Sequence, residues 1–137
     1  MNDKLCITTL RCLALDMIDK ANSGHPGMAL GSAPILHTIY SRHLTATAAE
    51  PNWIKRDRFV LSSGHVSSLL YAMLHLTGFD LTMEDLKQFR QFNSKTPGHP
   101  EYKVTEGVDI STGPLGQGIA NAVGMGFTSQ NMASKNE

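Results

Sequence analysis

Apolar residues spaced three or four positions apart predict a helix near the start of the chain. The positions are Cys6, Leu10, Leu13 and Met17. Asn2 and Asp3 offer side chains that cap a helix start. Gly24 is a natural cap at the other end, and Pro26 forbids continuation. We therefore expect one amphipathic helix that ends at "ANSGHPG".

The same spacing predicts four further helices along the chain. They begin at Ser32, near Leu69, at Thr82 and near Ile119. Thr82 with Asp85 three residues later has the pattern of a capping box, in which two side chains satisfy the first free amides of a helix. The last helix opens inside a glycine-rich stretch, and we expect the polar run "SQNMASKNE" to end it.

One segment has the pattern of a buried strand. In "RFVLSSGH", Phe59, Val60 and Leu61 form an unbroken apolar run, as expected of a strand that is covered on both faces in a parallel sheet. We therefore expect an α/β fold with a parallel sheet flanked by helices. One strand cannot satisfy its backbone groups alone. We expect the sheet to be incomplete in this chain, which continues or pairs with something beyond Glu137.

Composition and charge narrow the classes of protein to which the chain can belong. It has 137 residues, 41% of them hydrophobic, with twelve basic and twelve acidic residues, which is typical of a globular domain or part of one. The balanced charge argues against nucleic acid or a membrane surface as a partner. Cys6 and Cys12 have neither disulfide nor zinc spacing, so we expect free thiols. No signal-peptide pattern follows Met1, and we expect a cytoplasmic protein.

Three of the six histidines directly follow a glycine where a regular element ends. They are His25 in "SGHPG", His65 in "SSGHVSS" and His99 in "TPGHPE". At neutral pH an imidazole can give or take a proton, and a flexible neighbouring backbone lets it reach a ligand. His65 also follows the expected strand, where open α/β sheets bind ligands beside a helix start.

Ordinary turn chemistry explains the same stretches without a ligand. Glycine and proline can stop a helix and fix its exit in "SGHPG" and "PGHPE", and "SSGH" can be a tight turn with an exposed imidazole. Turns do not need histidine, so its recurrence favours a site. The remaining His37, His43 and His75 lie in helical segments, where packed or solvent-facing histidines are expected.

The stretch "TGPLGQGIANAVGMG", residues 112–126, weakens a helix start with glycines. It lacks the lysine of a phosphate-binding P-loop, and no clear strand precedes it, so neither that motif nor a dinucleotide fingerprint fits. Gly116 and Gly118 can serve close helix packing. Alternatively, backbone groups of residues 113–115 contact a flat ligand for which the glycines clear the space.

In this order and at these separations, the motifs resemble the N-terminal part of the transketolase family. The most specific block is "NSKTPGHPE" followed by "GVDISTGPLGQGIANAVGMG", and "RDRFVLSSGH" and "LLYAMLHLTGFDL" add to it. The resemblance runs from about residue 10 to residue 126. It implies a thiamine diphosphate enzyme of the pentose phosphate pathway. This transferase moves a two-carbon ketol unit from a ketose phosphate to an aldose phosphate.

The resemblance also implies roles for individual residues. In the family, the histidine that matches His25 contacts the substrate and assists proton transfer. The one that matches His65 lies by the diphosphate and reactive centre of the cofactor, and the position of His99 faces the cofactor and the donor's hydroxyl groups. The segment whose backbone holds the cofactor's aminopyrimidine matches Gly113, Pro114 and Leu115. The implied assembly is a homodimer.

Two departures from the family pattern affect what the chain can do alone. Val66 stands where the family usually has glycine, which would put a branched side chain beside the diphosphate and predicts altered affinity. The motif for metal and diphosphate, Gly-Asp-Gly with a later asparagine, has no counterpart here. Ligands for magnesium or calcium are therefore expected beyond residue 137, as is the activating glutamate. We expect residues 1–137 to be the N-terminal part of the cofactor diphosphate-binding domain, inactive alone.

Three interpretations stay open at this point. The chain is the N-terminal portion of a transketolase, one subunit of a split transketolase whose partner carries the missing motif, or a non-catalytic remnant that binds sugar phosphates or a partner protein. A sister enzyme such as dihydroxyacetone synthase shares much of the pattern. The abrupt stop near a helix end favours the first interpretation, and the three retained histidines argue against the remnant.

Overall fold

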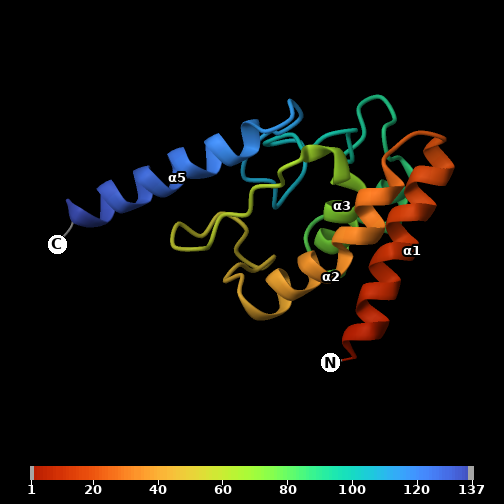
Figure 1. Cartoon of the computed structure of the whole chain (residues 1–137), viewed down its shortest axis with the longest axis horizontal. Coiled ribbons are helices and arrows are strands. Elements are labelled where there is room, and N and C mark those ends of the chain that lie inside the picture. Colours follow the sequence, from red (N-terminus) through yellow and green to blue (C-terminus); the bar gives the residue numbers. More distant parts are fainter. Residues whose placement is uncertain (1, 136–137) are drawn as a thin grey trace.

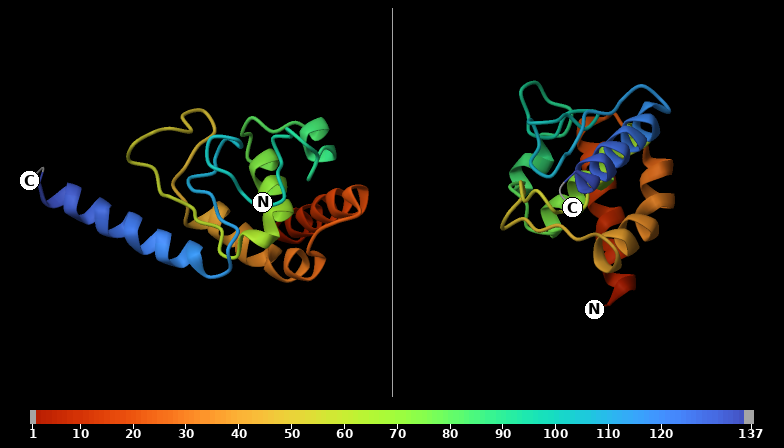
Figure 2. Two further views of the ribbon diagram at one scale, coloured as in Figure 1. Left: turned by 90° about the horizontal axis from the view of Figure 1, so that it is seen from above. Right: turned by 90° about the vertical axis from the view of Figure 1, so that its left-hand side faces the viewer.

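A computed structural model describes residues 2–135, which form a packed helical body and one projecting helix. Three helices, α1 (Asp3–Ala21), α2 (Pro26–Arg42) and α3 (Ser67–Leu76), pack together, and α5 (Gln117–Ser134) extends away from them (Figure 1). A short 3₁₀ turn, η1 (Gly64–Val66), precedes α3, and α4 (Met83–Lys87) follows it. Seen from above, α5 again lies apart from the packed helices (Figure 2).

The first helix, α1, is confirmed and is capped at both ends. The Asn2 side chain accepts a hydrogen bond from the Leu5 backbone N–H at 3.2 Å. At the other end, Asn22 adopts the left-handed conformation that ends the helix, with φ 47°, so the expectation that Gly24 is the cap is wrong. Gly24 is needed for a different reason, because a Cβ there would lie 2.6 Å from Ile18 Cγ1. The chain therefore turns tightly against α1.

The second helix, α2, begins at Pro26 rather than at the expected Ser32. Proline suits the first helical position because its missing N–H would be unpaired there anyway. Pro34 lies inside the helix and leaves the Leu30 carbonyl without its usual N–H donor. Arg11 Nε of α1 donates to this carbonyl at 2.9 Å. A bond between two helices thus replaces the one that proline removes.

Helix α3 is the centre of the packed body. Eight of its ten residues are buried. Leu69 packs with α1 and α2 in one core cluster, and Leu70 packs in a second cluster with Phe79 and Phe89. Full burial of an aliphatic side chain of this size stabilises a fold by about 1.5–3 kcal/mol. Because α3 contributes to both clusters, it connects the two halves of the core.

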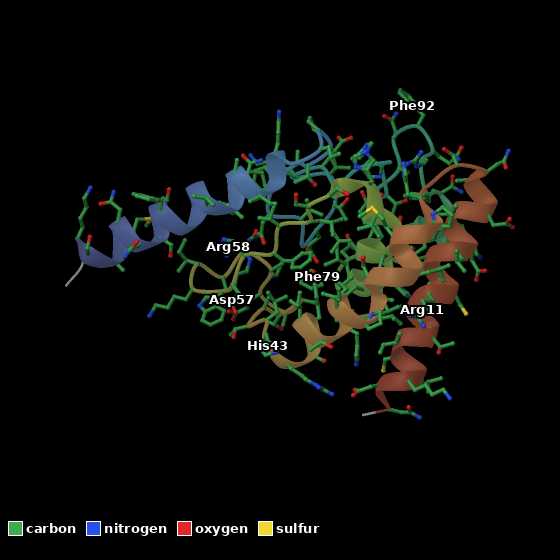
Figure 3. The ribbon with its side chains drawn as sticks, viewed as in Figure 1. Arg11, His43, Asp57, Arg58, Phe79 and Phe92 are labelled. Atoms are coloured by element: carbon green, nitrogen blue, oxygen red, sulfur yellow. The ribbon has the colours of Figure 1, made fainter. Side chains whose placement is uncertain are left out.

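The short helix α4 is confirmed with its predicted capping box. The Asp85 N–H donates to Thr82 Oγ1 at 3.2 Å, and the Thr82 N–H donates to Asp85 Oδ2 at 2.8 Å. The helix ends before Phe89. In the following loop Phe92 is 95% exposed and points away from the body, whereas Phe79 is directed into it (Figure 3). The second core cluster therefore includes Phe89, at the start of this loop, and leaves Phe92 outside.

The predicted parallel sheet is wrong, because residues 2–135 contain no β-strand. Residues 59–61, which had the strand pattern, form no regular secondary structure. The Phe59 N–H donates to Asp109 Oδ2 at 3.1 Å, not to the backbone of a neighbouring strand. A strand requires a ladder of backbone hydrogen bonds with a neighbour. The regular secondary structure of the described residues is therefore helical, and the α/β assignment is corrected.

The last helix, α5, is longer than predicted and continues through most of "SQNMASKNE" to Ser134. Its apolar side chains Ile119, Val123 and Phe127 are 65%, 62% and 74% exposed. Only Gly118 is buried among its residues. Helix α5 therefore relies on its own backbone hydrogen bonds, with little packing to support it.

No helix of the described chain has the combined length and apolar character needed to cross a membrane.

Candidate functional site

Three histidines from three separate segments come together in one cluster. His25 precedes α2, His65 lies in η1, and His99 lies in the loop that follows α4. The ring centroid of His65 is 5.0 Å from those of both His25 and His99, at interplanar angles of 85° and 89°. Edge-to-face packing of this kind is favourable for aromatic rings. The structure thus brings together all three histidines that follow a glycine in the sequence.

His65 is at the centre of the cluster and has an unsatisfied ring nitrogen. A Cβ on the preceding Gly64 would lie 2.6 Å from Thr112 Oγ1 and 2.9 Å from the Thr112 carbonyl, so this close approach requires glycine. His65 Nδ1 and Thr112 Oγ1 are both buried without a hydrogen-bond partner. A buried polar atom without a partner costs about 1–3 kcal/mol. A ligand that hydrogen-bonds to these two atoms would remove that cost.

Helix α3 holds the loop that carries His99. Ser67 Oγ donates to the Gly98 carbonyl at 2.8 Å, and the Tyr71 hydroxyl lies 2.8 Å from the Pro97 carbonyl and 3.2 Å from the His99 carbonyl. Burial raises the pKa of the Tyr71 phenol, so the phenol keeps its proton and donates. The His99 loop is therefore fixed to the most buried helix of the molecule.

The surroundings of His99 lower the pKa of its imidazole. Burial is the largest cause, followed by the neighbouring His65, the Arg90 guanidinium and His25, while Glu101 acts in the opposite direction. A lowered pKa keeps the ring neutral at pH 7, with one nitrogen able to accept a proton and the other able to donate one. His99 is thus suited to proton transfer near neutral pH.

Two residues at the site, Arg90 and Ser23, were missed by the sequence analysis. Arg90 Nη1 donates to Ser23 Oγ at 2.7 Å, and Arg90 Nη2 lies 3.5 Å from His25 Nδ1. The bonded residues are 67 positions apart, so no spacing rule connects them. The signal that could have found them is their place in the motifs: Ser23 opens "SGHPG", and Arg90 lies shortly before "TPGHPE".

The segment before α5 forms another side of the site. The Thr112 N–H donates to the Pro100 carbonyl at 3.0 Å, which ties this segment to the His99 loop. A Cβ on Gly113 would lie 3.6 Å from His99 Cγ, so Gly113 lies directly beside the imidazole. Residues 114–115 follow and are exposed. Backbone groups of this segment are therefore accessible next to the histidines.

An ion-pair cluster joins the segments that lead into the site. The Asp109 side chain is 8% exposed, pairs with Arg56 and lies 3.8 Å from Arg58 Nε. Its other carboxylate oxygen accepts the Phe59 N–H. The chain runs from Phe59 into η1, and from Asp109 into the glycine-rich segment. The buried carboxylate therefore holds these two segments together. Removing one partner of a buried ion pair costs about 3–5 kcal/mol.

The other three histidines lie outside the cluster. His37 is buried in α2, with Nε2 3.1 Å from Asp3 Oδ1. His75 Nδ1 lies 2.7 Å from the Leu81 carbonyl. His43 directly follows α2 as its C-cap. These contacts belong to the helical body and leave the three clustered histidines as the candidate site.

In the part of the chain that the structure describes, no three side chains of His, Cys, Asp or Glu are placed to hold a metal ion.

Val66, which directly follows His65, is buried. It is 3% exposed and packs in the same core cluster as Leu69. The core therefore takes up its branched side chain. Its effect on affinity for a diphosphate stays a prediction.

Comparison with known proteins gives consistent matches. A family model described as "Transketolase, thiamine diphosphate binding domain" matches residues 2–137. The transketolase of Geobacillus stearothermophilus is 58% identical over 132 residues, 96% of this chain and 20% of that protein. Transketolase 1 of Saccharomyces cerevisiae is 58% identical over 132 residues, 96% of this chain and 19% of that protein. The chain thus spans about a fifth of the length of the curated relatives that it matches.

A solved structure is similar in fold as well as in sequence. It is the crystal structure of transketolase from Pichia stipitis in complex with sedoheptulose-7-phosphate. The TM-score is 0.87 at 55% identity, and the match covers 89% of this chain and 18% of that one. At this identity the similarity extends beyond the fold to the family.

Proposed function

The chain belongs to the transketolase family, and from that premise we propose that it is the N-terminal part of the thiamine diphosphate binding domain of a transketolase. The complete enzyme moves a two-carbon ketol unit from a ketose phosphate donor to an aldose phosphate acceptor. The observation that carries the proposal is the cluster of His25, His65 and His99 beside the backbone of residues 113–115. In this proposal the remainder of the enzyme completes the site.

The described residues fit a bound thiamine diphosphate in two respects. His65 Nδ1 and Thr112 Oγ1 are buried without a partner, which suits contacts with polar groups of a ligand. The accessible backbone beside His99 suits contact with a flat ring. We assign His65 and Thr112 to the diphosphate side of the cofactor. The aminopyrimidine is assigned to the backbone of Gly113, Pro114 and Leu115.

Proton transfer is the chemical task that these side chains can perform. In ketol transfer, substrate hydroxyl protons must leave and return as a carbon–carbon bond breaks and forms, and the bound cofactor supplies the electron sink for that bond. His99, kept neutral by its lowered pKa, is suited to take and return such a proton. His25 is exposed at the edge of the cluster, where it can reach a sugar hydroxyl. We assign both residues to substrate binding and proton transfer.

Further parts of the proposal rest on the family resemblance. Magnesium or calcium binds with the cofactor's diphosphate through ligands outside this chain, and the complete enzyme is a homodimer. Its substrates are sugar phosphates of the pentose phosphate pathway, and the Pichia stipitis complex with sedoheptulose-7-phosphate supports a ketose phosphate donor. The location is cytoplasmic. Cys6 and Cys12, both free thiols, support a reducing compartment.

The test is ketol transfer by the complete protein with thiamine diphosphate, magnesium, sedoheptulose-7-phosphate and an aldose phosphate acceptor. We expect His65→Ala to lower cofactor-dependent turnover by about 10²-fold or more and the free energy of unfolding by less than about 1 kcal/mol. The matched control is His43→Ala, at the end of α2, which should change neither. Absence of transfer by the unmodified protein, or equal losses of turnover and stability in His65→Ala, would contradict the proposal.

A second variant separates substrate binding from cofactor binding. We expect His25→Ala to lower turnover while the affinity for thiamine diphosphate stays within about threefold, because His25 lies at the exposed edge of the cluster. The measurement is steady-state kinetics together with calorimetric titration of the cofactor. Unchanged kinetics in His25→Ala would remove it from the assigned residues.

A further inference from the structure

Arg90 connects two of the loops that carry site histidines. Its backbone N–H donates to the Thr96 carbonyl at 2.9 Å, within the loop that leads to His99. Its side chain reaches the turn between α1 and α2, where Nη1 donates to Ser23 Oγ at 2.7 Å and Nη2 lies 3.5 Å from His25 Nδ1. One guanidinium therefore joins segments that are distant in sequence, at the point where His25 enters the cluster.

The guanidinium is held in place at some cost. Arg90 has φ 62°, in the left-handed region that residues other than glycine rarely adopt. Its guanidinium carbon lies 5.5 Å from the ring centroid of the buried Phe89, and a Cβ on Gly98 would lie 3.4 Å from Arg90 Nε. This Nε is buried without a partner. Strained backbone and an unpaired buried donor both oppose folding, so stability alone does not account for the arrangement.

In the contact with His25, Arg90 can only be the hydrogen-bond donor. A guanidinium carries N–H donors and no acceptor, and it stays protonated in proteins. In a hydrogen bond between the two side chains, His25 Nδ1 is the acceptor, which leaves the ring proton on Nε2. The two ring nitrogens lie on different sides of the imidazole. Nε2–H is thus a donor on the side of the ring away from Arg90.

We propose that Arg90 is a positioning residue that holds His25 in the Nε2–H tautomer and fixes its ring so that Nε2–H can donate to a substrate oxygen. The proposal rests on the proposed function, in which His25 contacts the sugar. Ser23 supports this role, because its hydroxyl oxygen accepts a hydrogen bond from the other terminal nitrogen of the guanidinium, Nη1. Without Arg90, the ring turns more freely and both neutral tautomers are populated.

The tautomer of His25 can be measured without substrate or cofactor. The complete protein is labelled with ¹⁵N-histidine, and the His25 signals are assigned by their loss in His25→Gln. We expect a single Nε2–H tautomer in the unmodified protein, a mixture in Arg90→Met, and partial recovery in Arg90→Lys, whose ammonium retains a donor. The matched control is Arg11→Met, which removes an arginine that donates to the Leu30 carbonyl away from the cluster. It should leave the His25 signals unchanged.

Kinetics provide the second readout. Arg90→Met should lower kcat about tenfold or more, because a misplaced proton donor is costly. The donor KM and the cofactor affinity should change by less than about threefold. Ser23→Ala keeps the guanidinium but removes its anchor, so it should give a smaller loss in the same direction. If Arg90→Met does not fold, the exposed Ser23→Ala decides the question.

The outcomes separate this proposal from the proposed function. Identical His25 signals in the unmodified protein and in Arg90→Met would overturn the role of Arg90, as would equal effects of Arg90→Met and Arg11→Met. A complete protein that performs no ketol transfer would overturn the proposed function. The tautomer measurement, which needs no substrate, would still decide the role of Arg90.

Discussion

Helices α3 and α5 both carry apolar residues at helical spacing, yet their surroundings are opposite. Eight of the ten residues of α3 are buried, whereas Gly118 alone is buried in the 18-residue α5. Helix α3 lies within the packed body and α5 projects from it (Figure 1). Apolar spacing therefore indicates where a helix forms, and it does not indicate whether another element covers its apolar face.

The candidate site depends on α3 far more than on α5. Ser67 and Tyr71 of α3 bond to the backbone of the His99 loop, and η1, which carries His65, leads directly into α3. Helix α5 approaches the site at its first turn, where a Cβ on Gly118 would meet Ser62. The site is thus built on loops that a rigid, buried helix positions.

The largest difference between the two helices should come from deleting a side chain. Leu70 on α3 is 2% exposed and Val123 on α5 is 62% exposed. We expect Leu70→Ala to lower the free energy of unfolding of the 137-residue chain by about 2–5 kcal/mol, because it leaves a cavity. Val123→Ala should change it by less than about 0.5 kcal/mol. Urea unfolding measures both, and equal effects would contradict the contrast in burial.

Replacing each of two glycines in α5 by alanine should change the stability of the chain in opposite directions. A Cβ on Gly118 would lie 2.7 Å from Ser62 Cβ, whereas nothing lies within 4 Å of one on Gly124. Gly118→Ala should therefore destabilise the chain by about 1–3 kcal/mol through overpacking. Gly124→Ala should stabilise α5 by up to about 1 kcal/mol through helix propensity. Thermal unfolding and helical content distinguish them, and stabilisation by both substitutions would contradict the close contact at Gly118.

A single oxygen on α3 tests the link between the helix and the site. Tyr71→Phe removes the hydroxyl that lies 2.8 Å from the Pro97 carbonyl, which should cost about 1–2 kcal/mol. The complete protein should also bind thiamine diphosphate more weakly, since the His99 loop loses an anchor. Tyr102→Phe, at a tyrosine that is 55% exposed, is the control. Unaltered cofactor affinity in Tyr71→Phe would show that α3 does not position this loop.

The smallest expected effect is the contribution of His99 to the pH dependence of stability. Its pKa is lowered in the folded chain from the ordinary value of 6.5. Between that value and the lowered one, the unfolded chain binds more protons, so stability falls as the pH decreases through this window. His99→Gln should flatten this loss. Urea unfolding at a series of pH values measures it, and an unchanged pH profile in His99→Gln would contradict the lowered pKa.

The parts of the fold that the sequence predicts correctly are those set by contacts within one helical turn. The caps at Asn2 and at Thr82 with Asp85 involve residues three positions apart, so the pattern contains all of the partners. The main error concerns a segment whose form depends on distant partners, since residues 59–61 have no neighbouring strand. The helix cap expected at Gly24 and the helix start expected at Ser32 are also wrong, although both are local features.

The candidate site also has parts that local patterns predict and parts that depend on distant segments. The motifs identify His25, His65 and His99 individually, because each follows a glycine at the end of a regular element. Their convergence depends on how three loops fold around α3, which no local pattern contains. Arg90 was missed for the same reason, since its partner Ser23 is 67 positions away.

The most direct test of the account is histidine footprinting of the complete protein with diethyl pyrocarbonate, followed by mass spectrometry, with and without thiamine diphosphate and magnesium. We expect the cofactor to slow the modification of His25, His65 and His99 together and to leave His43, at the end of α2, unchanged. Protection that misses the three clustered histidines, or that extends equally to His43, would contradict the claim that these loops form one cofactor site.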